Sequence, residues 1–175
     1  MSSARLSCFL LLSCLVVFPG NAQAAGQQCP PVAFVGDAVH LDQFADGVKP
    51  APGAALFEAR LEGFGGGCSF DTGRVEVDLK LKIVAARGPA MSGDTASFTY
   101  FVAITDDQEN ILIKEEFPTA IKFEDGKSSG ETEEELTQII PLPEGVDPAS
   151  RRILVGFQLT EDQLAWNRKL LYPGP

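Results

Sequence analysis

Apolar and charged residues alternate along positions 75–83, where two Val, two Leu and one Ile are separated by Glu, Asp and two Lys. Side chains on an extended backbone point alternately to opposite faces, so a period of two is typical of a strand between a core and water. The pattern predicts a half-buried β-strand, and it is the clearest element of the chain.

Two apolar runs rich in β-branched and aromatic residues, 96–105 and 111–114, flank the polar segment 106–110. This arrangement predicts a β-hairpin with a polar turn. Further strands are expected over six segments that are separated by connections bearing Gly, Pro or Ser: 32–35, 56–61, 68–70, 119–124, 135–141 and 152–159.

These segments amount to eight or nine short strands with turn signals about every ten residues and no helix alternating with them. Such spacing favours an all-β fold, namely an antiparallel β-sandwich of the immunoglobulin-like or fibronectin-like kind. A closed barrel is the alternative, because strand order cannot be read from periodicity.

One short α-helix is expected, over residues 160–171. Thr160 followed by Gln163 fits a capping box, and Pro173 ends the segment. Its apolar positions are Leu164, Ala165, Trp166, Leu170 and Leu171. We expect the helix to dock on the sandwich with part of the Trp166 ring buried; the alternative is a helix offered to a partner protein.

Residues 1–24 have the pattern of a secretory signal peptide. Arg5 gives a positive start, residues 6–18 form an apolar stretch too short to span a bilayer, and residues 22–24 are Ala-Gln-Ala. Cleavage is expected between Ala24 and Ala25. The remaining residues, 25–175, are then expected to form a single domain that is periplasmic or secreted.

A lipid anchor on Cys14 is the alternative use of the same leader. Residues 11–14, Leu-Leu-Ser-Cys, match part of a lipobox, in which the cysteine becomes the first mature residue. Residues 15–18 continue the apolar stretch past Cys14, and a good cleavage site follows. Signal cleavage after Ala24 is therefore favoured over a membrane-tethered lipoprotein.

Cleavage after Ala24 leaves two of the four cysteines, Cys29 and Cys68. An even pair in an exported protein predicts a disulfide bond. Two free thiols, or a redox or metal-binding pair, are the alternatives. The chain has no Cys-x-x-Cys motif, and its one histidine, His40, cannot complete a Cys2His2 set, so the disulfide is favoured.

The chain is acidic, with a net charge of −10 that becomes −11 once the leader removes Arg5 and no acid. Polyanions are bound through clustered Lys and Arg, so nucleic acid is not an expected partner. After the leader, no apolar run approaches the roughly 20 residues of a membrane span. The mature chain is therefore not expected to cross a membrane.

No catalytic residue, metal ligand or cofactor is assigned from the sequence. His40 has Asp37 and Asp42 nearby, but no Gly-x-Ser-x-Gly nucleophile elbow accompanies them. The oxygen-rich segment 106–110 lacks the spacing and the glycine of an EF-hand, and a hairpin turn explains it better than a calcium site. Paired carboxylates among the 24 acids would carry no sequence signature.

Four stretches resemble uncharacterised exported envelope proteins of Gram-negative bacteria, many of which are lipoprotein-like. They are Cys29-Pro30, residues 87–90, residues 100–103, and above all residues 153–160 followed by Glu161, Ala165, Asn167 and Arg168. The resemblance covers most of residues 25–175. It implies an envelope location, and no activity comes with it.

These observations predict a periplasmic or envelope-associated β-sandwich that is not an enzyme. We expect a binding or structural module with an envelope protein as its partner. A carboxylate-based hydrolase or a calcium-supported carbohydrate-binding domain is the alternative.

Overall fold

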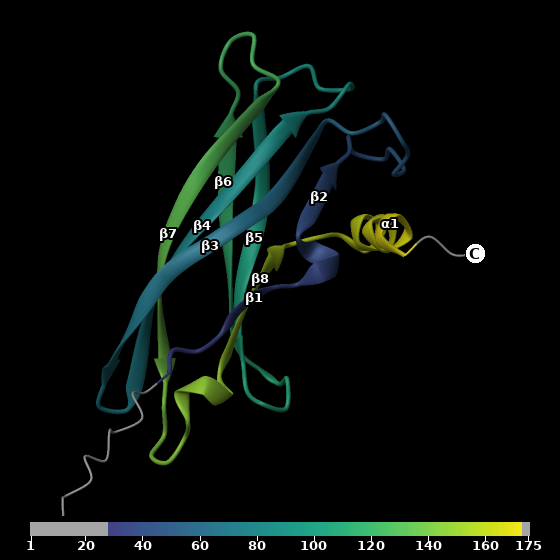
Figure 1. Cartoon of the computed structure of the whole chain (residues 1–175). Helices are drawn as coiled ribbons and strands as arrows, with labels where there is room; N and C mark the ends of the chain where they lie inside the picture. The colour runs from purple at the N-terminus through teal and green to yellow at the C-terminus, as the bar shows by residue number, and fades with distance from the viewer. Residues whose placement is uncertain (1–27, 173–175) are drawn as a thin grey trace, which may run out of the picture.

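The strands form two four-stranded sheets that pack face to face (Figure 1). This computed structural model describes residues 28–172. One sheet has the order β1-β8-β5-β6 and the other the order β2-β3-β4-β7. In chain order the elements are β1 (Val32–Phe34), the 3-10 turn η1 (Gly36–Ala38), β2 (His40–Gln43), β3 (Phe57–Asp71), β4 (Arg74–Arg87), β5 (Thr95–Thr105), β6 (Ile111–Lys122), β7 (Ser129–Pro141), the 3-10 turn η2 (Pro148–Ser150), β8 (Arg152–Phe157) and α1 (Glu161–Leu171).

The predicted all-β sandwich with a C-terminal helix is confirmed, with one correction to its strand directions. Five of the six strand pairs are antiparallel, but β1 pairs with β8 in parallel. Parallel neighbours need a long connection. Here the whole of the chain between β1 and β8 supplies that connection, because β1 leads through η1 into the opposite sheet.

The alternation along β4 places its apolar side chains in the core between the sheets. Val75, Leu79 and Ile83 are each 1% exposed or less. Their charged neighbours lie on the outer face, where Lys80 pairs with Glu135 and Lys82 pairs with Glu131 of β7. The period of two therefore determines both the core and the pattern of charge on the outer face.

Two pairs of predicted strands turn out to be single long strands. The segments 56–61 and 68–70 both belong to β3, which begins at Phe57 and continues through the glycines. The segments 111–114 and 119–124 both belong to β6, which continues through Pro118 and ends at Lys122. Gly66 has φ +134°, and a Cβ there would lie 1.8 Å from the Asp78 carbonyl oxygen, so only glycine fits against β4. Pro118 is tolerated because β6 is an edge strand.

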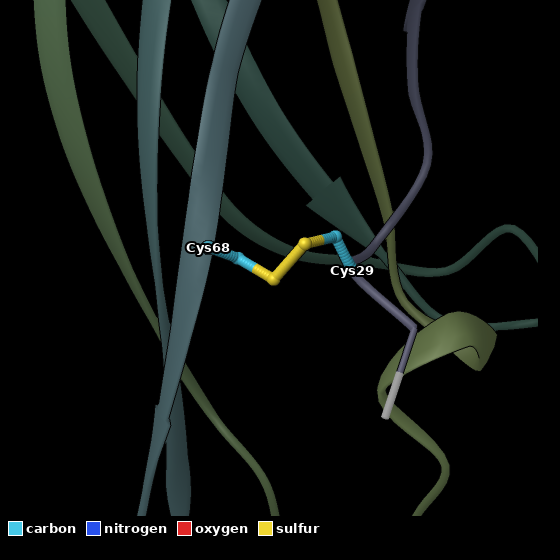
Figure 2. Close-up of a disulfide and its surroundings, with 2 residues drawn as sticks. All are labelled: Cys29 and Cys68. Atoms are coloured by element: carbon cyan, nitrogen blue, oxygen red, sulfur yellow. A yellow bond between two sulfur atoms is a disulfide. The ribbon is translucent and has the colours of Figure 1, made fainter. Parts of the chain in front are cut away.

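A disulfide joins Cys29, just before β1 of one sheet, to Cys68 on β3 of the other (Figure 2). The two Cα atoms are 5.8 Å apart, and 39 positions separate the residues in sequence. Nearby, the rings of Phe34 and Phe64 meet edge to face with centroids 5.1 Å apart. These contacts brace the two sheets along the stretch of β3 that β2 does not pair with.

Helix α1 begins as the sequence predicts. The Thr160 side chain accepts a hydrogen bond from the Gln163 backbone N–H, and the Gln163 side chain accepts one from the Thr160 N–H. This capping box satisfies two of the free donors in the first turn. Among residues 28–172, no helix has the length and apolar character needed to cross a membrane.

Candidate functional site

The outer face of the β2-β3-β4-β7 sheet carries a hollow of about 670 Å³. At this place the outward residues of the central strand β4 are small, Val84 and Ala86. The neighbouring strands carry long side chains at the paired positions, including Arg60 and Glu58 of β3. Short side chains between long ones leave a hollow. Its full lining is His40, Glu58, Ala59, Arg60, Glu62, Val84, Ala85, Ala86, Lys122, Glu124, Lys127, Ser129, Gly130 and Glu131.

The lining mixes both signs of charge. Lys82, at the border of the hollow, lies 3.1 Å from Glu131 and 4.0 Å from Glu62, so these two carboxylates are already paired. Arg60 and Lys127 form no ion pair with any other residue of the described range 28–172. Their charges remain available to a ligand.

One end of the hollow is formed by a cluster around Asp42, which is only 7% exposed. Antiparallel pairing of β2 with β3 sets Asp42 opposite Glu58 and His40 opposite Arg60. Nε2 of His40 lies 2.8 Å from Oδ1 of Asp42, and the Trp166 indole N–H donates to Oδ2 at 2.6 Å. Both oxygens of this carboxylate therefore have partners.

The electrostatics of Asp42 follow from these partners. Burial by itself raises the pKa of the Asp42 carboxyl, because it penalises the charged form. The hydrogen bonds from His40 and Trp166, together with the charge of His40, outweigh the burial, and the pKa lies below its ordinary value of 3.8.

Helix α1 holds the far side of the same cluster with amide side chains. The Asn167 side-chain amide donates to the carbonyl oxygens of Asp37 at 2.9 Å and His40 at 2.6 Å, and the Gln163 amide donates to that of Asp42 at 3.3 Å. Arg168 adds an ion pair with Asp37 at 2.7 Å. The helix thus fixes the backbone of β2 and of the residues before it.

The prediction of a docked helix is confirmed, but not all of its apolar side chains face the sandwich. Trp166 is half-buried as expected. Leu170 and Leu171 are 52% and 49% exposed, whereas the buried residues of α1 are Gln163 and Asn167. The reason is that α1 lies beside β2 (Figure 1), an edge strand whose free backbone groups require polar partners.

The acidic segment 106–110 forms the hairpin turn that the sequence favours over a calcium site. Oδ1 of Asp106 accepts the backbone N–H groups of Gln108 and Asn110, at 3.0 and 2.8 Å. Oδ2 accepts the Asn110 side-chain amide at 2.9 Å. The first carboxylate of the segment is therefore used to close the turn.

The remaining sequence-predicted sites divide into two groups. Cys29 and Cys68 are joined as predicted. The expected cleavage site at Ala24 and Ala25 and the alternative lipidation site at Cys14 lie outside the described residues. Sequence reasoning missed Glu58 and Arg60, although the alternation of Glu58, Arg60 and Glu62 with apolar residues indicates that the three share one outer face.

No protein-family model matches the chain, and no curated protein matches its sequence. The hollow and the Asp42 cluster must therefore be interpreted from their own chemistry.

Proposed function

We propose that the chain is an exported, non-enzymatic binding module of the bacterial cell envelope, and that the hollow beside β4 is its binding surface. The observation that carries the proposal is a hollow whose unpaired cations, Arg60 of β3 and Lys127 of the β6–β7 loop, lie among carboxylates. A concave site with a few convergent polar groups is the usual form of a ligand site.

The charge pattern favours a partner that carries both signs of charge. The chain as a whole has a net charge of −10, which repels a purely anionic partner at long range. Within the hollow, Arg60 and Lys127 offer anchors for carboxylates, while Glu58 and Glu124 offer anchors for cations. A segment of an envelope protein with alternating charges has this chemistry.

Export is supported by two features that are independent of each other. The leader has a charged start, an apolar middle and an Ala-x-Ala end. The disulfide between Cys29 and Cys68 is of a kind that forms and persists outside the reducing cytosol.

A photo-crosslinking side chain at position 86 in growing cells tests the binding surface. Ala86 is an exposed residue on a central strand facing the hollow, and Ser97 is the control, an exposed small residue on the outer face of β5 in the other sheet. We expect one defined protein adduct from position 86, none from position 97, and loss of the adduct in Arg60→Glu. Equal adducts from both positions contradict the proposal.

The intact mass of the protein recovered from cells tests where the leader is cleaved and whether the protein is lipid-anchored. We expect a soluble species that begins at Ala25 and takes up two alkyl groups only after reduction. A species that begins at a lipid-modified Cys14 would instead establish a membrane-tethered lipoprotein and would contradict the proposal of a soluble module.

A hydrolase that uses carboxylates of the hollow is the second candidate, because four glutamates line it. A general acid requires an apolar surrounding that keeps its carboxyl protonated. All four glutamates are exposed, and two of them face Lys82. Release of sugar or acyl products by the wild type, abolished in Glu58→Gln or Glu124→Gln, would make this candidate the better one.

A further inference from the structure

We propose that His40, Asp42 and Glu58 form a site for one divalent transition-metal ion, zinc being the best fit, at the end of the hollow. This metal site is independent of the proposed binding function, since the three residues can bind an ion whether or not the hollow binds a partner.

The placement of the three residues follows from strand register. Asp42 and Glu58 are directly opposite across the β2–β3 pair, and His40 is two residues before Asp42 on the same face. One ring nitrogen of His40 and one oxygen from each carboxylate lie within 4.8 Å of one another. These atoms are near enough to share a single ion after small side-chain movements.

The charge at Asp42 supplies an independent reason to expect a cation. Its carboxylate is 7% exposed, and no Lys or Arg of residues 28–172 lies within 4.0 Å of it. Buried charges in proteins are paired or coordinate metals. The one charged partner available is His40, which is a full cation only when protonated.

Glu58 is free to act as a ligand. Its side chain forms neither a hydrogen bond nor an ion pair with the rest of the described chain, although Arg60 is its neighbour on the same face of β3. An unengaged carboxylate beside a buried one offers an ion a second negative ligand without giving up any contact of its own.

Helix α1 supplies the support that metal ligands require. The Trp166 N–H holds Oδ2 of Asp42, which leaves Oδ1 directed at His40, and Asn167 holds the backbone of His40. Outer hydrogen bonds of this kind orient first-sphere ligands and raise affinity. The Asp42 carboxylate and the backbone of His40 are thus held in place before an ion arrives.

One imidazole and two carboxylates suit zinc better than calcium, which prefers oxygen ligands alone. Tetrahedral zinc places its ligand atoms about 3.3 Å apart. The 2.8 Å between Nε2 of His40 and Oδ1 of Asp42 needs to widen by only about 0.5 Å. Three protein ligands leave the fourth position open toward the hollow.

The test is a zinc titration of the chain from residue 25 to 175, free of any histidine-bearing tag and stripped with a chelator. Calorimetry is expected to give one zinc per chain, no comparable calcium binding, and at least tenfold weaker zinc binding in Glu58→Gln. Glu62→Gln is the matched control, since it lines the same hollow outside the cluster, and its affinity is expected within twofold of wild type.

A second readout separates a metal site from a structural hydrogen-bond cluster. Because His40 is the only histidine, nitrogen-labelled imidazole gives one pair of NMR signals, and zinc is expected to shift the Nε2 signal. Trp166→Phe is expected to weaken zinc binding 10- to 100-fold by removing the outer hydrogen bond. No zinc binding, an unshifted His40 signal, or equal effects of Glu58→Gln and Glu62→Gln would overturn the proposal.

Discussion

Between the two sheets the buried side chains are almost all apolar, and Tyr100, Phe123 and Phe157 are the largest of those that are fully buried. On α1, by contrast, the buried residues are Gln163 and Asn167. The sheets are held by area removed from water, which acts without direction. The helix is held by hydrogen bonds to the Asp37–Asp42 segment, which act only at set distances and angles. The first interface supplies stability, and the second fixes the position of the residues around Asp42.

Removing the disulfide is expected to have the largest effect, because it joins the two sheets. In the chain-entropy model, a loop of about 40 residues gives about 4 kcal/mol of stabilisation. The double variant Cys29→Ser, Cys68→Ser should therefore unfold at a much lower urea concentration than the oxidised wild type. Wild type measured in reductant is the control and should match the variant; an unchanged midpoint for both would contradict the bridging role.

The second-largest effect is expected from shortening a side chain in the apolar interface between the sheets. Leu79 is 1% exposed in the middle of β4, so Leu79→Ala is expected to lower the free energy of unfolding by about 2–5 kcal/mol. The neighbouring Lys80 faces solvent, and Lys80→Ala is expected to leave the free energy of unfolding almost unchanged. Urea unfolding of both variants compares the two faces of one strand. Similar losses for both would mean that the alternation does not define the core.

The polar interface is probed at Trp166. Trp166→Phe keeps a ring near Phe44 but removes the hydrogen bond to Asp42, and a loss of about 1–3 kcal/mol is expected because the acceptor is a buried charge. Leu170→Ala together with Leu171→Ala is the control, expected within about 1 kcal/mol of wild type because both leucines are half exposed. If the leucines proved the more costly change, the helix would dock through its apolar residues after all.

The same contrast explains what could be predicted from the sequence. The core strands could be predicted because burial repeats every second residue, and α1 could be predicted because Thr160 and Gln163 are only three residues apart. The continuity of β3 through Gly63–Gly67 could not, since it depends on the close approach of β4 to Gly66.

The candidate site could not be predicted from the sequence for a related reason. β2 is four residues long and shows no clear period, and the meeting of His40, Asp42 and Glu58 depends on its register with β3. The buried role of Asn167 depends on the free backbone groups of the edge strand beside it. Local sequence patterns predict which side chains are buried against a sheet. They do not predict which polar groups will form hydrogen bonds with a segment that is distant in sequence.

The smallest effect is expected from removing a polar group, the Tyr100 hydroxyl, from the apolar interface between the sheets. The Tyr100 hydroxyl is buried near the Glu134 carboxylate but meets the geometry of a hydrogen bond with none of the described residues, and its ring stacks on Phe117. At neutral pH, Tyr100→Phe is therefore expected to change the free energy of unfolding by less than about 1 kcal/mol. A large loss would mean that the hydroxyl has a partner that stabilises the fold.

At alkaline pH the Tyr100 hydroxyl is expected to make the free energy of unfolding depend on pH. Burial raises the pKa of Tyr100 above its ordinary value of 10.0, and the nearby carboxylate of Glu134 adds to the shift. In the unfolded chain the phenol ionises near pH 10, whereas in the fold it stays protonated, so its contribution is complete below pH 10 and is lost as the pH rises further. Above pH 10, wild type should lose up to about 1.4 kcal/mol per pH unit more than Tyr100→Phe, measured by urea unfolding. Parallel curves for the two proteins would show that Tyr100 ionises in the folded state as it does in the unfolded chain.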